Sequence, residues 1–302
     1  MKVGLIDVDS HNFPNLALMK ISAYHKAQGD EVEWWWGWGQ YDRVYMSKVF
    51  DHTYSPDHPE PVNAKEIIKG GTGYGLDSKL PDEIEHMYPD YSLYPELTRD
   101  TAYGFLSRGC PRGCPFCIVK DKEGRKSYKV ADLSEWWNGQ KNIVLCDPNI
   151  LACREHMDLL RQLADSKAWV DINQGIDARM LTEENIEVIK WIKLKEIHFS
   201  WDLMEQSDAV LKGLELWKKH GKKVAHGSWG MVYVLVNYDT TMVENLYRVK
   251  EIASMGFDPF VMVYDKPNAP KEIRDLQRWC NNKRIFKSCT FCEYRGGNKN
   301  GY

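Results

Sequence analysis

The chain has 302 residues, 43% of them hydrophobic, and a formal net charge of −3. This length suits about two globular domains, and so small a net charge gives no general attraction to nucleic acid or anionic membranes. No window approaches the roughly 18 consecutive apolar residues of a membrane helix, and the apolar run 3–6 is too short for a signal peptide. We therefore expect a cytoplasmic protein with no membrane partner, whose cysteines stay reduced.

Residues 1–80 alternate between strand and helix patterns. An apolar strand at 3–7 precedes an amphipathic helix at 15–28, which ends at Gly29. Further strands are predicted at 31–36, 43–47 and around 67–68, the last leading into the run Gly70-Gly71-Thr72-Gly73. This alternation predicts a small Rossmann-like α/β domain.

The aromatic run Trp34-Trp35-Trp36-Gly37-Trp38 has two interpretations. We favour an interior strand, with one face against a helix and the other against a neighbouring domain. The alternative is a stacking platform for a nucleobase or a peptide aromatic. Residues 81–100 are rich in turn-forming prolines and in tyrosines, and we expect them to be a connector that packs against both domains.

From residue 101 to about 270 the pattern becomes a regular repeat of strands and helices. Strands are predicted at 103–107, 142–146, 169–173, 196–200, 231–236 and 259–264. Amphipathic helices are predicted at 157–164, 184–192, 208–220 and 243–255. Six such units predict a partial (β/α)6 barrel, with residues 271–302 as a C-terminal cap.

Parallel strands end at the same edge, so the segments that follow them should gather around one mouth. These segments are the cysteine-rich stretch after 107, Cys146–Asn149, Gln174–Arg179, Ser200–Asp202, Asn237–Asp239 and Tyr264–Asp265.

Three of the eight cysteines lie within eight positions, in the stretch Cys110-Pro111-Arg112-Gly113-Cys114-Pro115-Phe116-Cys117. A structural zinc site would normally need a fourth ligand, which only Cys146 or Cys153 would plausibly supply. Incidental reduced thiols are another interpretation. Three thiolates on a four-iron cluster would leave one iron free for an outside ligand.

This C-x3-C-x2-C spacing, with Phe116 before the last cysteine and a six-unit barrel around it, resembles the radical S-adenosylmethionine (SAM) enzymes over about residues 98–270. The resemblance implies that Cys110, Cys114 and Cys117 hold a [4Fe-4S] cluster whose fourth iron binds SAM. It further implies reductive cleavage of SAM to a 5'-deoxyadenosyl radical that abstracts hydrogen from a substrate, with flavodoxin or ferredoxin as electron donor. The substrate, a small molecule, nucleotide or peptide, is not specified.

The same resemblance suggests which residues contact SAM. Asp147 stands where the family places groups that receive the SAM amino group, although Cys146-Asp147-Pro148-Asn149 replaces its common Gly-Gly-Glu, and Asn149 is a second candidate. A turn that opens the next helix is the alternative for Asp147. The other candidates, which follow later strands, are Gln174, Arg179, Ser200, Asp202 and Asn237.

Some of these candidates have structural alternatives. Arg179 would pair either with the SAM carboxylate or with Asp177 in an internal ion pair. For the segment that follows the fifth strand and includes Asn237, the alternative is that Asp239 or Thr240 only caps the following helix. One interpretation of Cys280, Cys289 and Cys292 is an auxiliary metal site. We favour the other, that they are ordinary thiols packed in the C-terminal cap.

The N-terminal domain resembles, in part, the cobalamin-dependent branch of the family. Its Asp9-Ser10-His11-Asn12-Phe13-Pro14 and later Gly70-Gly71 match a cobalamin motif except that Pro14 replaces a glycine. Cobalamin is therefore possible but not favoured. The alternatives to a radical SAM hydrogen-abstracting enzyme are a cobalamin-dependent methyltransferase and a non-catalytic iron–sulfur or zinc binding module.

Overall fold

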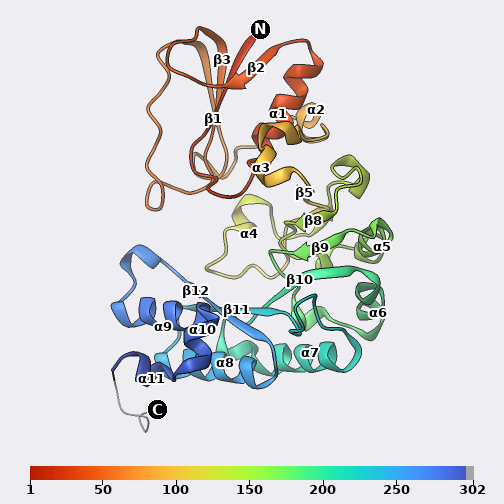
Figure 1. The fold of residues 1–302 in the computed structure, drawn as a ribbon, viewed down its shortest axis with the longest axis vertical. Coiled ribbons are helices and arrows are strands. Elements are labelled where there is room, and N and C mark those ends of the chain that lie inside the picture. The colour runs from red at the N-terminus through yellow and green to blue at the C-terminus, as the bar shows by residue number, and fades with distance from the viewer. Residues whose placement is uncertain (297–302) are drawn as a thin grey trace.

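The computed structural model describes residues 1–296 and shows a mixed α/β protein built on two parallel sheets (Figure 1). A four-stranded sheet comes from the N-terminal part of the chain and a six-stranded sheet from the remainder. A short antiparallel ribbon of β6 (Ser107–Arg108) and β7 (Tyr128–Lys129) lies between them in sequence. Within the described residues no helix is long and apolar enough to cross a membrane.

The smaller sheet has the order β2-β1-β3-β4, and all its strands are parallel. Its elements are β1 (Lys2–Asp7), α1 (Leu16–Ala27), β2 (Glu31–Trp34), β3 (Tyr41–Ser47) and β4 (Ala64–Gly70). Leu5 and Tyr45 pack with Leu18 of α1 on one face. On the other face Val44 and Met46 are covered by Trp35 and Tyr74 from loops.

All four predicted strands and the first helix of this domain form, the second strand ending earlier than predicted, but only one helical layer forms over the sheet among the described residues. The connections 35–40 and 48–63 contain no helix there, so loops replace the second layer of a doubly wound fold.

The prediction of an interior strand through the tryptophan run was wrong. Strand β2 ends at Trp34 and lies at the edge of its sheet, and after Trp35, whose N–H still donates to the Leu5 carbonyl at 2.9 Å, residues 36–38 leave the sheet. Trp38 is 88% exposed, whereas Trp35 packs on the sheet and donates from Nε1 to Asn63 Oδ1 at 2.8 Å. The misassignment arose because tryptophan favours strands, and this propensity does not show where a strand leaves its sheet.

Residues 81–100 connect the domains as predicted. They form α2 (Asp82–Glu85), η1 (Tyr91–Leu93) and α3 (Pro95–Thr98). Tyr94 donates its hydroxyl to Asp7 Oδ2 of the first domain at 2.6 Å, and Tyr91 donates to the Trp136 carbonyl of the second at 2.5 Å. The connector is therefore hydrogen-bonded to both domains.

The larger sheet has the order β12-β11-β10-β9-β8-β5, with every pairing parallel. Its strands are β5 (Thr101–Gly104), β8 (Asn142–Leu145), β9 (Trp169–Ile172), β10 (Lys193–Ser200), β11 (Met231–Val236) and β12 (Asp258–Val263). Because β5 and β12 are both edges, the sheet is open. Connecting helices are α5 (His156–Ser166), α6 (Glu183–Trp191), α7 (Ser207–His220) and α8 (Met242–Ser254).

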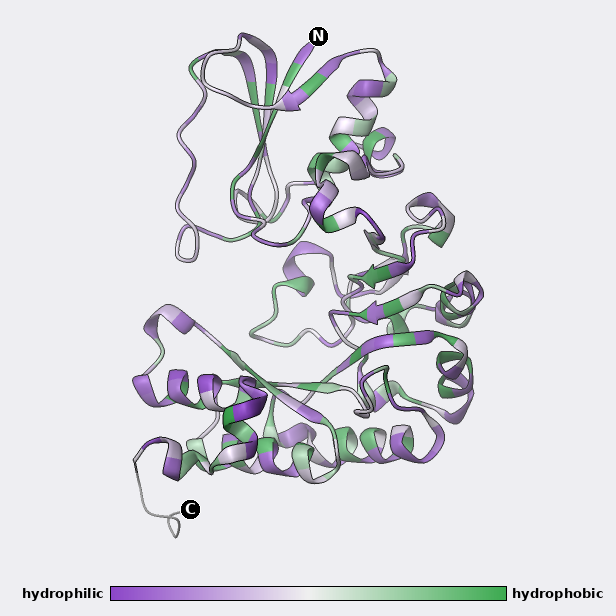
Figure 2. Cartoon of the chain, in the orientation of Figure 1, coloured by the Kyte–Doolittle hydropathy of each residue, from purple (hydrophilic) through white to green (hydrophobic). Residues whose placement is uncertain are grey.

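Alternate residues of this sheet face the helices. Ile172, Phe199 and Val234 are fully buried in the main core, while their neighbours Asp171 and Tyr233 remain partly exposed on the other face. Figure 2 accordingly shows hydrophobic and hydrophilic residues mixed along these strands. The polar face is therefore available to line a site.

The predicted first strand of this sheet was placed too late. β5 ends at Gly104, and the chain bends through Phe105 and Leu106 before β6 begins at Ser107. The cause is the buried Asp147, which binds the backbone of this bend as described below.

The C-terminal cap consists of α9 (Lys271–Asn281), α10 (Lys283–Ser288) and α11 (Phe291–Tyr294), while residues 297–302 lie outside the described part. Cys280 is buried with its thiol 3.6 Å from the Pro259 carbonyl, and the thiol of Cys289 lies 3.7 Å from the Ile285 carbonyl. These two thiols pack as ordinary side chains.

Gly213 of α7 lets this helix approach η4 (Ala178–Met180), which carries Arg179. A Cβ at Gly213 would lie 2.0 Å from the Ala178 carbonyl oxygen. We expect Gly213→Ala to lower the free energy of unfolding by roughly 1–3 kcal/mol through overpacking, measured by urea denaturation. The control Gly37→Ala meets no atom within 4 Å and should change it by about 0.5 kcal/mol or less. Equal effects at both positions would contradict this account.

Candidate functional site

The cysteine triplet lies in the loop between β6 and α4 (Val119–Lys122), and this loop reaches the segments that follow three strands of the large sheet. Asn149, after β8, donates from Nδ2 to Cys110 Sγ at 3.7 Å. Arg112 donates to Asp177, after β9, at 2.5 Å. Phe116 packs edge-on against Tyr238, after β11, with ring centroids 5.2 Å apart. The predicted convergence of these segments is confirmed for these three contacts.

The loop backbone is held in place from one side. Gly109 has φ +79°, and a Cβ there would lie 2.1 Å from the Lys126 carbonyl oxygen, so only glycine fits. Its N–H donates to Glu123 Oε2 at 2.9 Å. Lys120 of α4 donates to the carbonyls of Cys114 and Pro115. These contacts fold the loop back over α4 and fix where the cysteines lie.

All three thiols are free and partly exposed. Burial and then the nearby charge of Asp202 raise the pKa of Cys114, and interaction with Cys117 and Cys110 adds to this effect. Burial also raises the pKa of Cys117, with a contribution from Cys110. The thiols are therefore close enough to influence one another, and the raised pKa values of Cys114 and Cys117 favour their protonated forms before any metal binds.

Among the described residues, no three His, Cys, Asp or Glu side chains are already arranged around one point as ligands of a single ion. Cys146 and Cys153, the candidates for a fourth zinc ligand, are buried, and their thiols lie against the Val144 carbonyl and the Glu155 carboxylate. A cluster distributes its thiolates over several irons and thus needs them further apart than one ion does. The three thiols are free, so in their chemistry they can serve as ligands of such a cluster.

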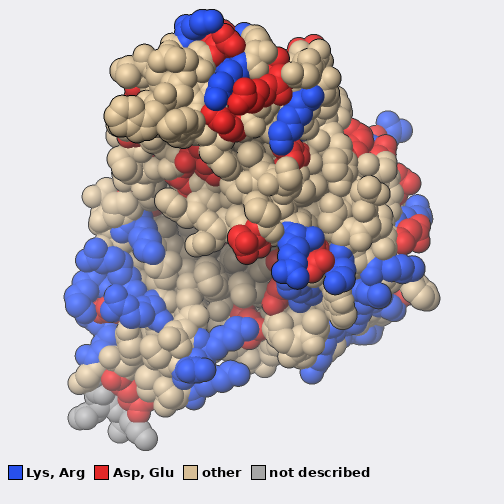
Figure 3. All heavy atoms as spheres, turned by 45° about the horizontal axis from the view of Figure 1, so that its top comes forward, with Lys and Arg blue, Asp and Glu red and all other residues tan. Residues whose placement is uncertain are grey.

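A cavity of about 500 Å³ lies beside Cys114. It is lined by Arg112, Gly113, Cys114, Pro115, Arg179, Leu203, Glu205 and Gln206. In Figure 3 the molecule is hollowed between its upper and lower parts, with acidic side chains in the hollow and basic ones gathered on both sides. The cysteine loop therefore borders a space that a small molecule can enter.

Asp177 is the centre of an ion-pair network with two arginines that line this cavity. Arg179 donates to it in a bidentate manner at 2.7 and 3.0 Å, and Arg112 donates from the cysteine loop. Burial alone would raise the pKa of Asp177, but the two arginines hold it below its usual value. The internal Asp177–Arg179 pair thus forms, and its additional bond to Arg112 was missed because sequence spacing does not show contacts between distant loops.

Asp202 is the other acidic group near the thiols. Burial raises its pKa to about 6, although the hydrogen bond from Ser200 and the charges of Arg248 and Arg179 oppose that shift. Arg248 of α8 is fully buried and donates to the carbonyls of Trp201 and Asp202, each at 2.7 Å. Sequence reasoning missed Arg248, although a charged residue on the apolar face of a helix was a usable signal.

Asp147 has a structural role instead of the expected free carboxylate. It is 1% exposed and accepts hydrogen bonds from the backbone N–H groups of Leu106 and Ser107, both at 2.7 Å, and from the Ser107 hydroxyl at 2.5 Å. Burial raises its pKa to about 7 against these bonds. The carboxylate holds the bend before the cysteine loop and is not open to a ligand.

The remaining candidates are divided between the site and structural roles. Asn149 is 3% exposed, and its Oδ1 is buried without a hydrogen-bond partner within the described chain, so it can accept from a ligand. Gln174 is exposed. Asn237 donates to the Tyr264 carbonyl at 2.8 Å and ties the ends of β11 and β12 together. The cap of α8 is Thr241, not Asp239 or Thr240.

The residues that suggested cobalamin have partners inside the N-terminal domain. Both carboxylate oxygens of Asp9 accept backbone N–H groups, from Val49 at 2.7 Å and Phe50 at 2.9 Å. A Cβ at Gly71 would lie 2.3 Å from the Lys48 carbonyl oxygen, so this glycine is required by the chain itself. Asp9 and Gly71 are thus explained by packing within the domain, whereas His11 of the same motif is exposed.

No family model and no curated protein matches this chain. The geometry of the site therefore carries the functional argument alone.

We expect Asp147→Ala to lower the free energy of unfolding by roughly 2–5 kcal/mol, because it leaves buried donors of the bend unsatisfied. Chemical denaturation measures this loss. The control Asp165→Ala removes an exposed carboxylate from α5 and should cost about 0.5 kcal/mol or less. A variant at Asp147 as stable as the control would contradict a structural role.

The raised pKa of Asp202 predicts that the free energy of unfolding depends on pH. Its folded carboxyl binds a proton more tightly than the unfolded one, so its contribution to stability is present at low pH and lost as pH rises through about 6. Between pH 5 and pH 7 the wild type should therefore lose about 1 kcal/mol relative to Asp202→Asn. Unfolding free energies of both proteins across this range measure the difference. Parallel pH profiles would contradict the raised pKa.

Proposed function

We propose that this protein is a radical SAM enzyme, in which Cys110, Cys114 and Cys117 hold a [4Fe-4S] cluster. The observation that supports this most is the group of three free, partly exposed thiols beside a cavity where the segments following several parallel strands meet. The C-terminal edge of parallel strands is where α/β enzymes of this kind place their chemistry.

Cluster binding requires the three thiols to lose their protons. Because burial raises the pKa values of Cys114 and Cys117, assembly releases protons and becomes weaker as pH falls. The bonds from Lys120 to the carbonyls of Cys114 and Pro115 fix the loop and place positive charge next to the resulting thiolates. With three protein ligands, one iron would remain open to SAM.

When bound, the cluster would supply one electron that cleaves SAM to methionine and a 5'-deoxyadenosyl radical, which takes hydrogen from a substrate. The protein's part is to bind, orient and exclude water. Asn149 Oδ1 and the Asp202 carboxylate are the acceptors suited to the SAM ammonium group. Phe116 of the cysteine loop packs edge-on against Tyr238 and would offer an aromatic surface to the ligand.

Arg179 is suited to the SAM carboxylate only in part, because two of its donors already bind Asp177. Arg179 nevertheless lines the cavity next to Cys114 and carries the positive charge that an anionic group would meet there. Its role is therefore to orient SAM through charge while Asp177 fixes its position.

The test is anaerobic reconstitution of the full chain with iron and sulfide, followed by addition of SAM and dithionite. We expect 5'-deoxyadenosine to appear, and to vanish in Cys114→Ala. The matched control is Cys289→Ala, a thiol of the C-terminal cap that packs against Ile285 and should leave the yield unchanged.

A cluster that loads fully but cleaves no SAM would overturn the enzyme proposal and leave a non-catalytic iron–sulfur module. Tight binding of one zinc ion with no iron uptake would indicate a zinc module instead. The cobalamin-dependent methyltransferase is not proposed, because Asp9 and Gly71 are occupied with contacts inside their own domain.

A further inference from the structure

A second cavity, of about 820 Å³, lies between the two domains, and Lys122 of α4 is among its lining residues. One wall is formed by the ends of β3 and β4 with α1 and residues 78–87, and the other by Phe105, Arg108 and Lys122. Ligands of open α/β sheets bind outside the carboxyl ends of the strands, and cavities of this volume accommodate small organic molecules. The proposed function assigns nothing to this space.

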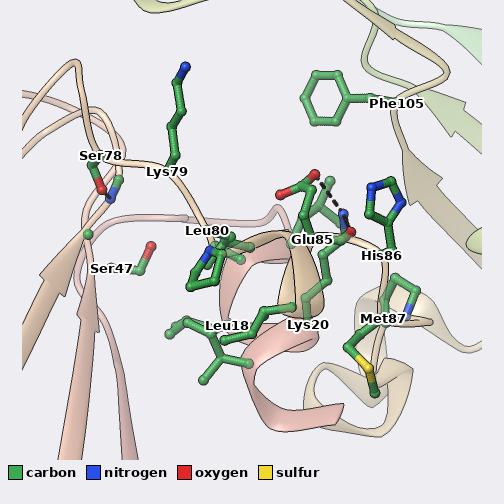
Figure 4. A pocket seen from close by; sticks show the side chains of 18 of the residues that line it. Leu18, Lys20, Ser47, Ser78, Lys79, Leu80, Glu85, His86, Met87 and Phe105 are labelled. Carbon is green, nitrogen blue, oxygen red and sulfur yellow. Dashed lines mark hydrogen bonds and ion pairs between the residues drawn. The ribbon is translucent and has the colours of Figure 1, made fainter. Parts of the chain in front are cut away.

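The cavity has a broad apolar surface. In Figure 4, Phe105 lies on one side of it, opposite Leu80 and Leu18, with Met87 below. The guanidinium carbon of Arg108 lies 3.9 Å from the centroid of the Phe105 ring, so this ring is already stacked by a cation. A flat aromatic group fits between such a ring and the aliphatic side chains opposite.

Most charged groups of the cavity neutralise one another. Lys20 donates to Glu85 at 2.8 Å, which Figure 4 marks with a dashed line. Arg108 donates to Glu123 at 2.9 Å, and His86 lies 2.9 Å from a Glu135 carboxylate oxygen. The remaining acids, Asp82 and Glu83, are exposed at the start of α2.

Two lysines in the cavity wall are not neutralised. Neither Lys79 nor Lys122 forms an ion pair with a carboxylate in residues 1–296. Lys122 donates to the Ser78 carbonyl at 2.6 Å, which brings it to the segment that carries Lys79. Burial lowers the pKa of Lys122, the nearby charges of Arg108 and Lys79 lower it further, and those of Glu123 and Asp77 oppose the shift. Of these three neighbouring cations, only Arg108 forms an ion pair with a carboxylate in residues 1–296.

We propose that this interdomain cavity binds a small molecule that carries both an aromatic ring and a phosphate group, of about the size of a nucleoside monophosphate. The ring packs on Phe105 and Leu80, and the phosphate binds Lys79 and Lys122. In this arrangement the phosphate pairs with the two lysines that have no carboxylate partner, and the ring covers the apolar wall. The proposal does not depend on the iron–sulfur chemistry.

Isothermal titration of the full chain with AMP tests the proposal, with adenosine and inorganic phosphate as separate arms. We expect saturable binding of AMP and weaker binding of each fragment. Lys79→Ala removes an exposed side chain and should leave the fold intact. It should weaken AMP binding by roughly tenfold or more, the usual effect of losing one charge-assisted hydrogen bond.

The control variant is Lys65→Ala, an exposed lysine on β4 that pairs with Asp42 outside the cavity, and it should bind AMP as the wild type does. Lys122→Gln should weaken AMP binding as Lys79→Ala does. Absence of AMP binding would overturn the proposal. AMP binding would also overturn the proposal if SAM displaced the AMP and if Lys79→Ala and Lys122→Gln left its affinity unchanged. That result would place AMP beside Cys114.

Discussion

The buried carboxylate of Asp147 is the interaction on which the arrangement of this site depends. It takes the backbone N–H groups of Leu106 and Ser107 just after β5 ends, where the chain leaves the large sheet. The bend turns the chain away from the sheet, and the cysteine loop begins two residues later. A carboxylate this deeply buried is costly unless it is hydrogen-bonded, and here three donors offset part of that cost. The Asp147 carboxylate, which the sequence suggested as a ligand contact, thus determines where the three thiols lie.

The cysteine loop then connects parts of the chain that are distant in sequence. It contacts the segments after β8, β9 and β11 through one side chain each, and its flank reaches the N-terminal domain through Lys122 and Ser78. The connector tyrosines hold the two domains together at the same level. The loop lines the cavity beside Cys114, and Lys122 of α4 lines the cavity between the domains.

Much of the fold could be predicted because the periodic spacing of hydrophobic residues can be read from short stretches of sequence. The six strands of the large sheet and the four helices between them follow from alternation and from i, i+3, i+4 spacing. The tryptophan run was misassigned, since a strong strand propensity does not reveal that β2 is an edge strand ending at Trp34. The cobalamin motif illustrates the same limit: Gly71 looks like a ligand contact in sequence, but its space is filled by the Lys48 carbonyl.

The site itself was predicted in outline and not in detail. Parallel strands place their following segments together, so the neighbourhood of Cys110, Asn149 and Asp177 could be foreseen. The partner of each polar group could not, because it depends on side-chain contacts between distant loops. Arg112 reaching Asp177, and Arg248 reaching the carbonyls of Trp201 and Asp202, are contacts of this kind.

Electron paramagnetic resonance of the reconstituted, dithionite-reduced protein tests the central claim most directly, because it observes the coordination of the cluster before any substrate is known. With three protein thiolates and one open iron, the spectrum of the reduced four-iron cluster should change when SAM is added. A four-iron signal that SAM leaves unaltered, or a protein that assembles no such cluster, would contradict the account.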